Sequence, residues 1–99
     1  MKLINLSEKL LRYMVSEYKK HGKQYFELET FKILYPEETD DFISKALYLL
    51  QHDGLVSIQS ADDVAFETAL NPMGIANVEE NTMIKKGYAA IKEIKSLLV

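Results

Sequence analysis

The stretch PEETDDFISKALYLLQHDGLV, residues 36–56, holds the clearest helix of the chain and the start of the strand that follows it. Thr39 is a favourable N-cap, and carboxylates in the next turn, at Asp40 and Asp41, complement the partial positive charge of a helix N-terminus. Apolar residues then recur at helical spacing: Ile43, Ala46, Leu47 and Leu50, with Phe42 and Leu49 widening the face. Gly54 ends the helix, and the run after it predicts a strand.

Upstream of this stretch, the pattern predicts two further helices with a short strand between them. The expected elements are a helix over residues 6–21, a strand over 25–28 and a short helix over 29–34. Asn5 and Glu8 have the spacing of a capping box for the first helix, and Gly22 offers the left-handed residue that ends it.

Downstream, two alternating runs separated by the polar tip ADD predict a β-hairpin. The first strand directs Val56 and Ile58 inward and leaves Ser57 and Gln59 outside. The second strand is expected to place four residues on one side of the sheet: Val64, Phe66, Thr68 and Leu70.

After the hairpin, Asn71 is expected to cap a helical start with Pro72 at its first position. A second start is expected at Asn81 or Thr82, with a helix from about residue 83 to 98. One stripe of that last helix contains Ile84, Tyr88, Ile91 and Leu98. This stripe is expected either to cover the core of its own chain or to pack against a second copy as a homodimer.

The order of these elements predicts an α+β fold, a winged helix-turn-helix with an appended C-terminal helix over residues 81–99. The segment ETDDFISKALYLLQHDGLVSI resembles the recognition helix and first wing strand of bacterial winged-helix proteins. The segment NPMGIANVEENTMIKKGYAAIKEIKSLL resembles the C-terminal part of the small YjcQ-like family of bacterial and phage-associated winged-helix proteins. The resemblance covers most of residues 1–99 and implies a fold more directly than an activity.

The composition indicates one small domain in a reducing compartment. A chain of 99 residues makes a single domain, and the absence of Cys excludes disulfides and thiolate chemistry. No apolar run approaches the roughly 20 residues that span a bilayer, and the first residues lack the apolar core of a signal peptide. We therefore expect a cytoplasmic protein without membrane contact.

The charge distribution of this chain differs from that of a DNA-binding winged-helix protein. The net charge is −3, and the acidic residues concentrate in residues 36–70, where Lys45 is the single basic residue. The face of the third helix expected to meet DNA comprises Asp41, Ser44, Lys45, Tyr48, Gln51 and His52, and the wing tip carries Asp62 and Asp63. Because most non-specific affinity comes from neutralised phosphates, this face predicts weak DNA contact.

The sequence offers little for catalysis. His21 and His52 are the only histidines, and no nucleophile elbow, phosphate-binding glycine loop or HExxH motif is present. No cofactor or metal is expected, and a carboxylate-based metal enzyme is a remote alternative. The expected function is a non-enzymatic regulatory module of transcription-regulator type with weak or partner-dependent DNA contact. The alternative is a protein-only adaptor that binds a basic partner through its acidic helix face.

Overall fold

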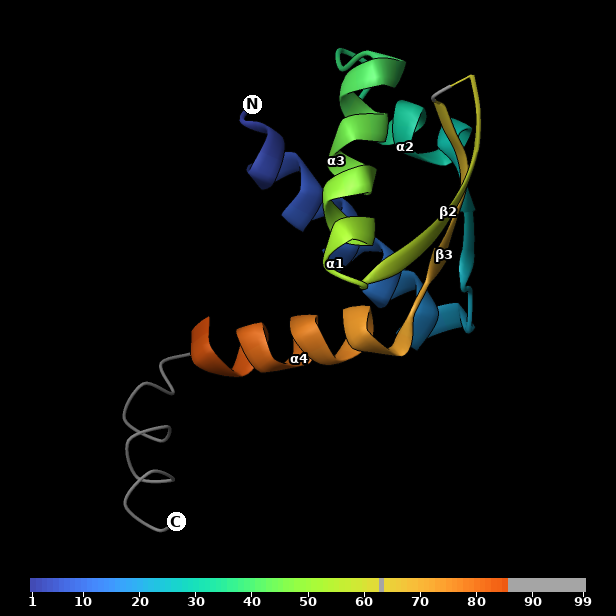
Figure 1. Ribbon diagram of the computed structural model, residues 1–99. Coiled ribbons are helices and arrows are strands. Elements are labelled where there is room, and N and C mark those ends of the chain that lie inside the picture. Colours follow the sequence, from blue (N-terminus) through green and yellow to red (C-terminus); the bar gives the residue numbers. More distant parts are fainter. Residues whose placement is uncertain (63, 86–99) are drawn as a thin grey trace, which may run out of the picture.

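The computed structural model describes residues 1–62 and 64–85, the last five of them by their backbone alone (Figure 1). Within these residues, four helices combine with one antiparallel sheet of three strands in the order β1-β3-β2. The elements are α1 (Leu3–His21), β1 (Tyr25–Glu27), α2 (Leu28–Leu34), α3 (Asp40–His52), β2 (Val56–Ala61), β3 (Val64–Leu70) and α4 (Pro72–Lys85). The α+β class predicted from the sequence is confirmed.

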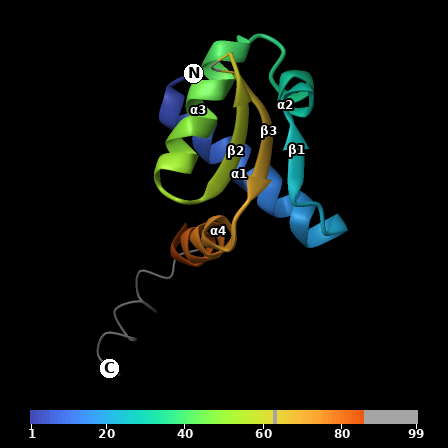
Figure 2. The same cartoon turned by 45° about the vertical axis from the view of Figure 1, so that its right-hand side comes forward.

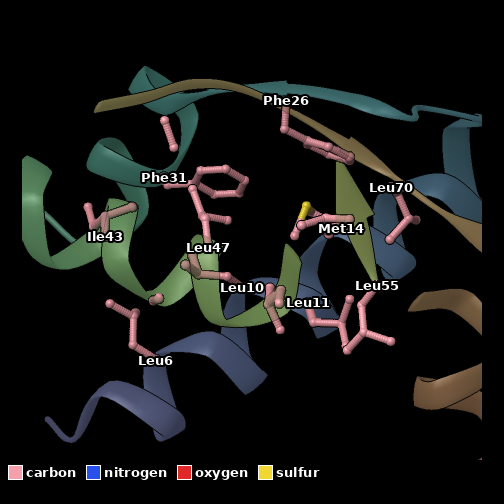
Figure 3. Close-up of a cluster of buried hydrophobic side chains, with 14 of the residues drawn as sticks. Leu6, Leu10, Leu11, Met14, Phe26, Phe31, Ile43, Leu47, Leu55 and Leu70 are labelled. Carbon is pink, nitrogen blue, oxygen red and sulfur yellow. The ribbon is translucent and has the colours of Figure 1, made fainter. Parts of the chain in front are cut away.

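The core lies between α1, α3 and the sheet, with α2 closing it at the end where α3 begins (Figure 2). Leu6, Leu10 and Met14 of α1 are fully buried against Phe31 of α2 and Leu47 of α3 (Figure 3). Across the lower end in Figure 1, where α3 turns into β2, the helix α4 packs against α1.

The first helix begins one turn earlier than its capping-box signal predicts. The N–H of Leu6 donates to the carbonyl of Lys2 at 3.1 Å, and Leu3 packs against the core, so the helix extends back to Leu3. The Asn5–Glu8 capping box is therefore wrong, because both residues lie inside α1 with exposed side chains. Gly22 ends the helix as predicted, at φ 69°.

The third helix has both of the ends that its sequence predicts. The Thr39 hydroxyl accepts the N–H of Phe42 at 3.0 Å. At the other end Gly54 adopts φ 75° and donates to the carbonyl of Gln51, while Leu55 donates to that of Leu50. These two bonds form a Schellman motif, which turns the chain directly into β2.

The hairpin contains a β-bulge that the sequence pattern does not reveal. Gln59 pairs with Glu67, but its neighbour Ser60 pairs with Ala65, so Phe66 is the extra residue in β3. An extra residue reverses the alternation of the strand. The prediction that Phe66 shares one side of the sheet with Thr68 and Leu70 is therefore wrong: Phe66 is 45% exposed, whereas Thr68 and Leu70, like Ala65, are buried.

The helix α4 is attached to the domain through the loop that precedes β2. The Asn71 backbone N–H donates to the carbonyl of Leu55, and its side chain donates to the carbonyl of Gly54 and accepts from the Ser57 hydroxyl. Pro72 occupies the first helical position, as predicted. The predicted second helix start at Asn81 or Thr82 is wrong, because α4 continues without a break to Lys85.

Candidate functional site

The face of α3 that was expected to meet DNA is only partly exposed. Asp41, Lys45, Gln51 and His52 have exposed side chains. Tyr48 is half-buried and packs against the core. The outward surface of α3 is therefore narrower and less polar than its sequence indicates.

Ser44 was expected on this outward face and is buried instead, with 1% of its surface exposed. Its hydroxyl accepts the backbone N–H of Ala65 at 3.1 Å, next to the bulge at Phe66. Ser44 lies one turn before Leu47 and so shares its inward direction. The Ser44 hydroxyl therefore holds α3 against the hairpin and is not available to a ligand.

We expect Ser44→Ala to lower the free energy of unfolding by about 1–2 kcal/mol, because it leaves the buried Ala65 N–H without its acceptor. Chemical denaturation of the two proteins measures the difference. Gln51→Ala, an exposed position on the same helix, is the matched control and should change stability by no more than about 0.5 kcal/mol. Equal effects of the two substitutions would contradict the structural role of Ser44.

Lys45, the exposed lysine on the outward face of α3, already forms an ion pair. The Lys45 ammonium lies 3.1 Å from the carboxylate of Asp41, one turn earlier on α3. A second lysine, Lys32 of α2, contacts the Asp40 carboxylate at 3.0 Å and donates to the carbonyl of Glu38. Exposed pairs of this kind contribute little to stability, but they neutralise the lysines that a phosphate would need.

Two segments that are distant in the sequence and carry carboxylates lie at the same end of the molecule. The start of α3 and the β2–β3 turn lie together at the top of the domain in Figures 1 and 2. The first segment carries Glu37, Asp40 and Asp41, all exposed, and the turn carries Asp62 in a left-handed conformation at φ 53°. Asp63, the second predicted residue of the wing tip, lies outside the described residues. We call the residues Glu37, Asp40, Asp41 and Asp62 the acidic edge.

The described part of the chain contains no group of three or more His, Asp or Glu side chains placed to hold a metal ion.

Burial, assisted by the nearby carboxylate of Glu17, raises the pKa of Tyr13. The Tyr13 ring packs edge-on against Phe26 and Phe31, with centroids 6.0 and 6.3 Å away. This tyrosine therefore stays protonated at neutral pH and has a packing role.

Of the predicted C-terminal stripe, Ile84 lies on α4 but its side chain is not described, and Tyr88, Ile91 and Leu98 lie outside the described residues. Over residues 1–62 and 64–85, no helix is both long and apolar enough to cross a membrane.

Comparison of the chain with known protein families, with curated proteins and with solved structures finds no match.

Proposed function

We propose that this chain is a non-enzymatic winged-helix module of regulatory type that binds a basic protein partner through its acidic edge. In this proposal, contact with DNA is weak or depends on the partner. The observation that carries it is the excess of negative charge at this edge, where the four carboxylates outnumber the two lysines, Lys32 and Lys45, that pair with Asp40 and Asp41.

The arrangement of the elements supports the winged-helix part of the proposal. The chain order α1-β1-α2-α3-β2-β3 and the sheet order β1-β3-β2 are compatible with a winged helix-turn-helix. In that arrangement α2 and α3 form the helix-turn-helix and β2–β3 forms the wing. The start of α3 and the hairpin turn would then be the two parts closest to a nucleic acid.

The charges at this position support a basic partner over DNA. Proteins that bind nucleic acid present a basic patch there, whereas this chain presents the carboxylates of the acidic edge. Complementary charge on a protein partner raises the rate of association and excludes wrong partners. The net negative charge of this edge, which remains after Lys32 and Lys45 have paired with two of its carboxylates, repels a phosphate backbone.

A gel-shift titration tests the DNA part. Unmodified protein is expected to bind random duplex DNA with a dissociation constant no tighter than about 10⁻⁴ M at physiological salt. Asp41→Lys, Asp62→Lys and Asp63→Lys together release Lys45 from its ion pair and raise the net charge from −3 to +3. This variant is expected to bind DNA with an affinity that falls steeply as salt increases.

The matched control carries the same change in net charge away from the acidic edge, as Glu27→Lys, Glu29→Lys and Glu80→Lys, all at exposed positions. It should bind DNA more weakly than the edge variant.

An anisotropy titration tests the basic-partner part of the proposal. A Lys/Arg-rich peptide should bind the unmodified protein and the control variant, and should lose affinity for the edge variant only. Tight, salt-dependent DNA binding by the unmodified protein would contradict the proposal.

A further inference from the structure

A half-open cleft of about 190 Å³ lies where α1, the end of α3 and α4 meet. Its apolar lining comprises Ile4, Leu11, Leu50 and Leu55. The three leucines retain 4–8% exposure, whereas Leu6, Leu10 and Met14 deeper in the core have none. Ile4 is 61% exposed. The core is therefore incompletely covered at this corner.

Two carboxylates line the same cleft, Glu8 from α1 and Asp53 from the end of α3. The volume is below the roughly 300–1,000 Å³ of sites that enclose a small-molecule ligand. An apolar floor with charged residues at its border instead fits the apolar face of an amphipathic helix, which inserts a few side chains into a groove. The carboxylates require that such a helix carry lysine or arginine beside its apolar face.

We propose that this cleft is the docking site of residues 86–99 of the same chain. The sequence of that segment, KGYAAIKEIKSLLV, places Tyr88, Ile91, Ile94 and Leu98 at helical spacing. Lys92 and Lys95 border this apolar stripe, and the segment carries three lysines against one glutamate. Its chemistry therefore complements both the leucine floor and the two carboxylates.

The path of α4 brings the segment within reach. Asn77 of α4 lines the cleft, and α4 ends eight residues later at Lys85. At 1.5 Å per residue, that end lies about 12 Å beyond the cleft. Gly87 supplies a residue suited to end one helix and reverse the chain. Residues 88–98 form about 16 Å of helix if helical, long enough to return along α4 to the cleft. This docking is independent of the acidic edge, which lies at the opposite end of the domain.

Amide hydrogen exchange in the full chain tests the proposal. Residues 88–98 are expected to exchange at least tenfold more slowly than an unstructured chain. Glu8→Lys with Asp53→Lys should remove that protection, because each replaces an attractive contact with a repulsive one. Adding Lys92→Glu and Lys95→Glu should restore protection to within about threefold of the unmodified chain. Glu27→Lys with Glu29→Lys, an equal charge change at exposed positions of β1 and α2 and away from both the cleft and α4, should leave it intact.

Crosslinking shows whether the segment bound in the cleft belongs to the same chain or to a second copy. Because the chain has no Cys, Asn5→Cys and Ser96→Cys provide a unique pair, one beside Ile4 and one within the segment. With a short bismaleimide at low micromolar protein, a crosslinked monomer is expected. Crosslinked dimers would assign the segment to a second copy and overturn the proposal. Unprotected amides in the unmodified chain, or protection that the cleft substitutions leave unchanged, would also overturn it.

Discussion

Replacing Leu47 with alanine is expected to lower the free energy of unfolding by about 2–5 kcal/mol, because the substitution leaves a cavity that the core can only partly close. Leu47 is fully buried, and Figure 3 shows it among Phe31, Ile43 and Leu10, which come from three different helices. The substitution therefore removes packing contacts through which α3 is held to both α1 and α2. Chemical denaturation with the same probe for both proteins gives the difference.

The control is Lys45→Ala, two residues earlier on the same helix and exposed. It removes an ion pair with Asp41 that is exposed on both sides, so its effect should stay within about 1 kcal/mol. Similar losses from Leu47→Ala and Lys45→Ala would mean that the inward face of α3 is assigned wrongly.

Gly74→Ala should destabilise the protein by about 2–3 kcal/mol even though alanine favours a helix by about 1 kcal/mol over glycine. A methyl group at Gly74 would lie 2.5 Å from the backbone carbonyl oxygen of Leu55 and 3.0 and 3.2 Å from the leucine methyls of Leu70 and Leu11. That carbonyl already accepts the N–H of Asn71, so it cannot move without breaking the attachment of α4. The expected loss therefore lies near the upper end of the cost of overpacking.

Two variants separate steric contact from backbone strain. Met73→Ala, at the exposed neighbour in α4, should change stability by no more than about 0.5 kcal/mol. Gly22→Ala places a methyl group in open space but at φ 69°, so it should cost about 1–2 kcal/mol from the left-handed backbone alone. A gain in stability from Gly74→Ala, as helix propensity alone predicts, would show that α4 does not pack closely on Leu55.

The sequence predicts the ends of α3 correctly because its signals act over a few residues. Thr39 and Gly54 each determine a local hydrogen-bonding pattern whose partners lie within five residues. The same holds for Gly22 and for Pro72 at the start of α4. Local chemistry of this kind does not depend on the rest of the fold.

The positions predicted wrongly depend on contacts that are distant in sequence. Ser44 was expected outside because it follows Asp41 at helical spacing, yet its partner Ala65 lies 21 residues later. Phe66 was expected on the same side of the sheet as Thr68 and Leu70 because strand residues alternate, yet a bulge in its pairing with β2 turns it to the other side. Leu49 was counted with the apolar face and is 38% exposed. The inward direction of Ser44 could have been found from its helical spacing to Leu47, but a bulge leaves no comparable signal in one strand.

The three hydrogen bonds of Asn71 also couple the docking of α4 to the register of the hairpin. They join the end of β3 to Gly54, Leu55 and Ser57, so all three can form only when the residues on either side of the hairpin are aligned. A slip of one residue between β2 and β3 would move Asn71 by about 3.3 Å and turn the side chains of one strand to the other face. The helix α4 can therefore make all three bonds only with a hairpin in its native register, so its docking stabilises that register relative to a pairing shifted by one residue.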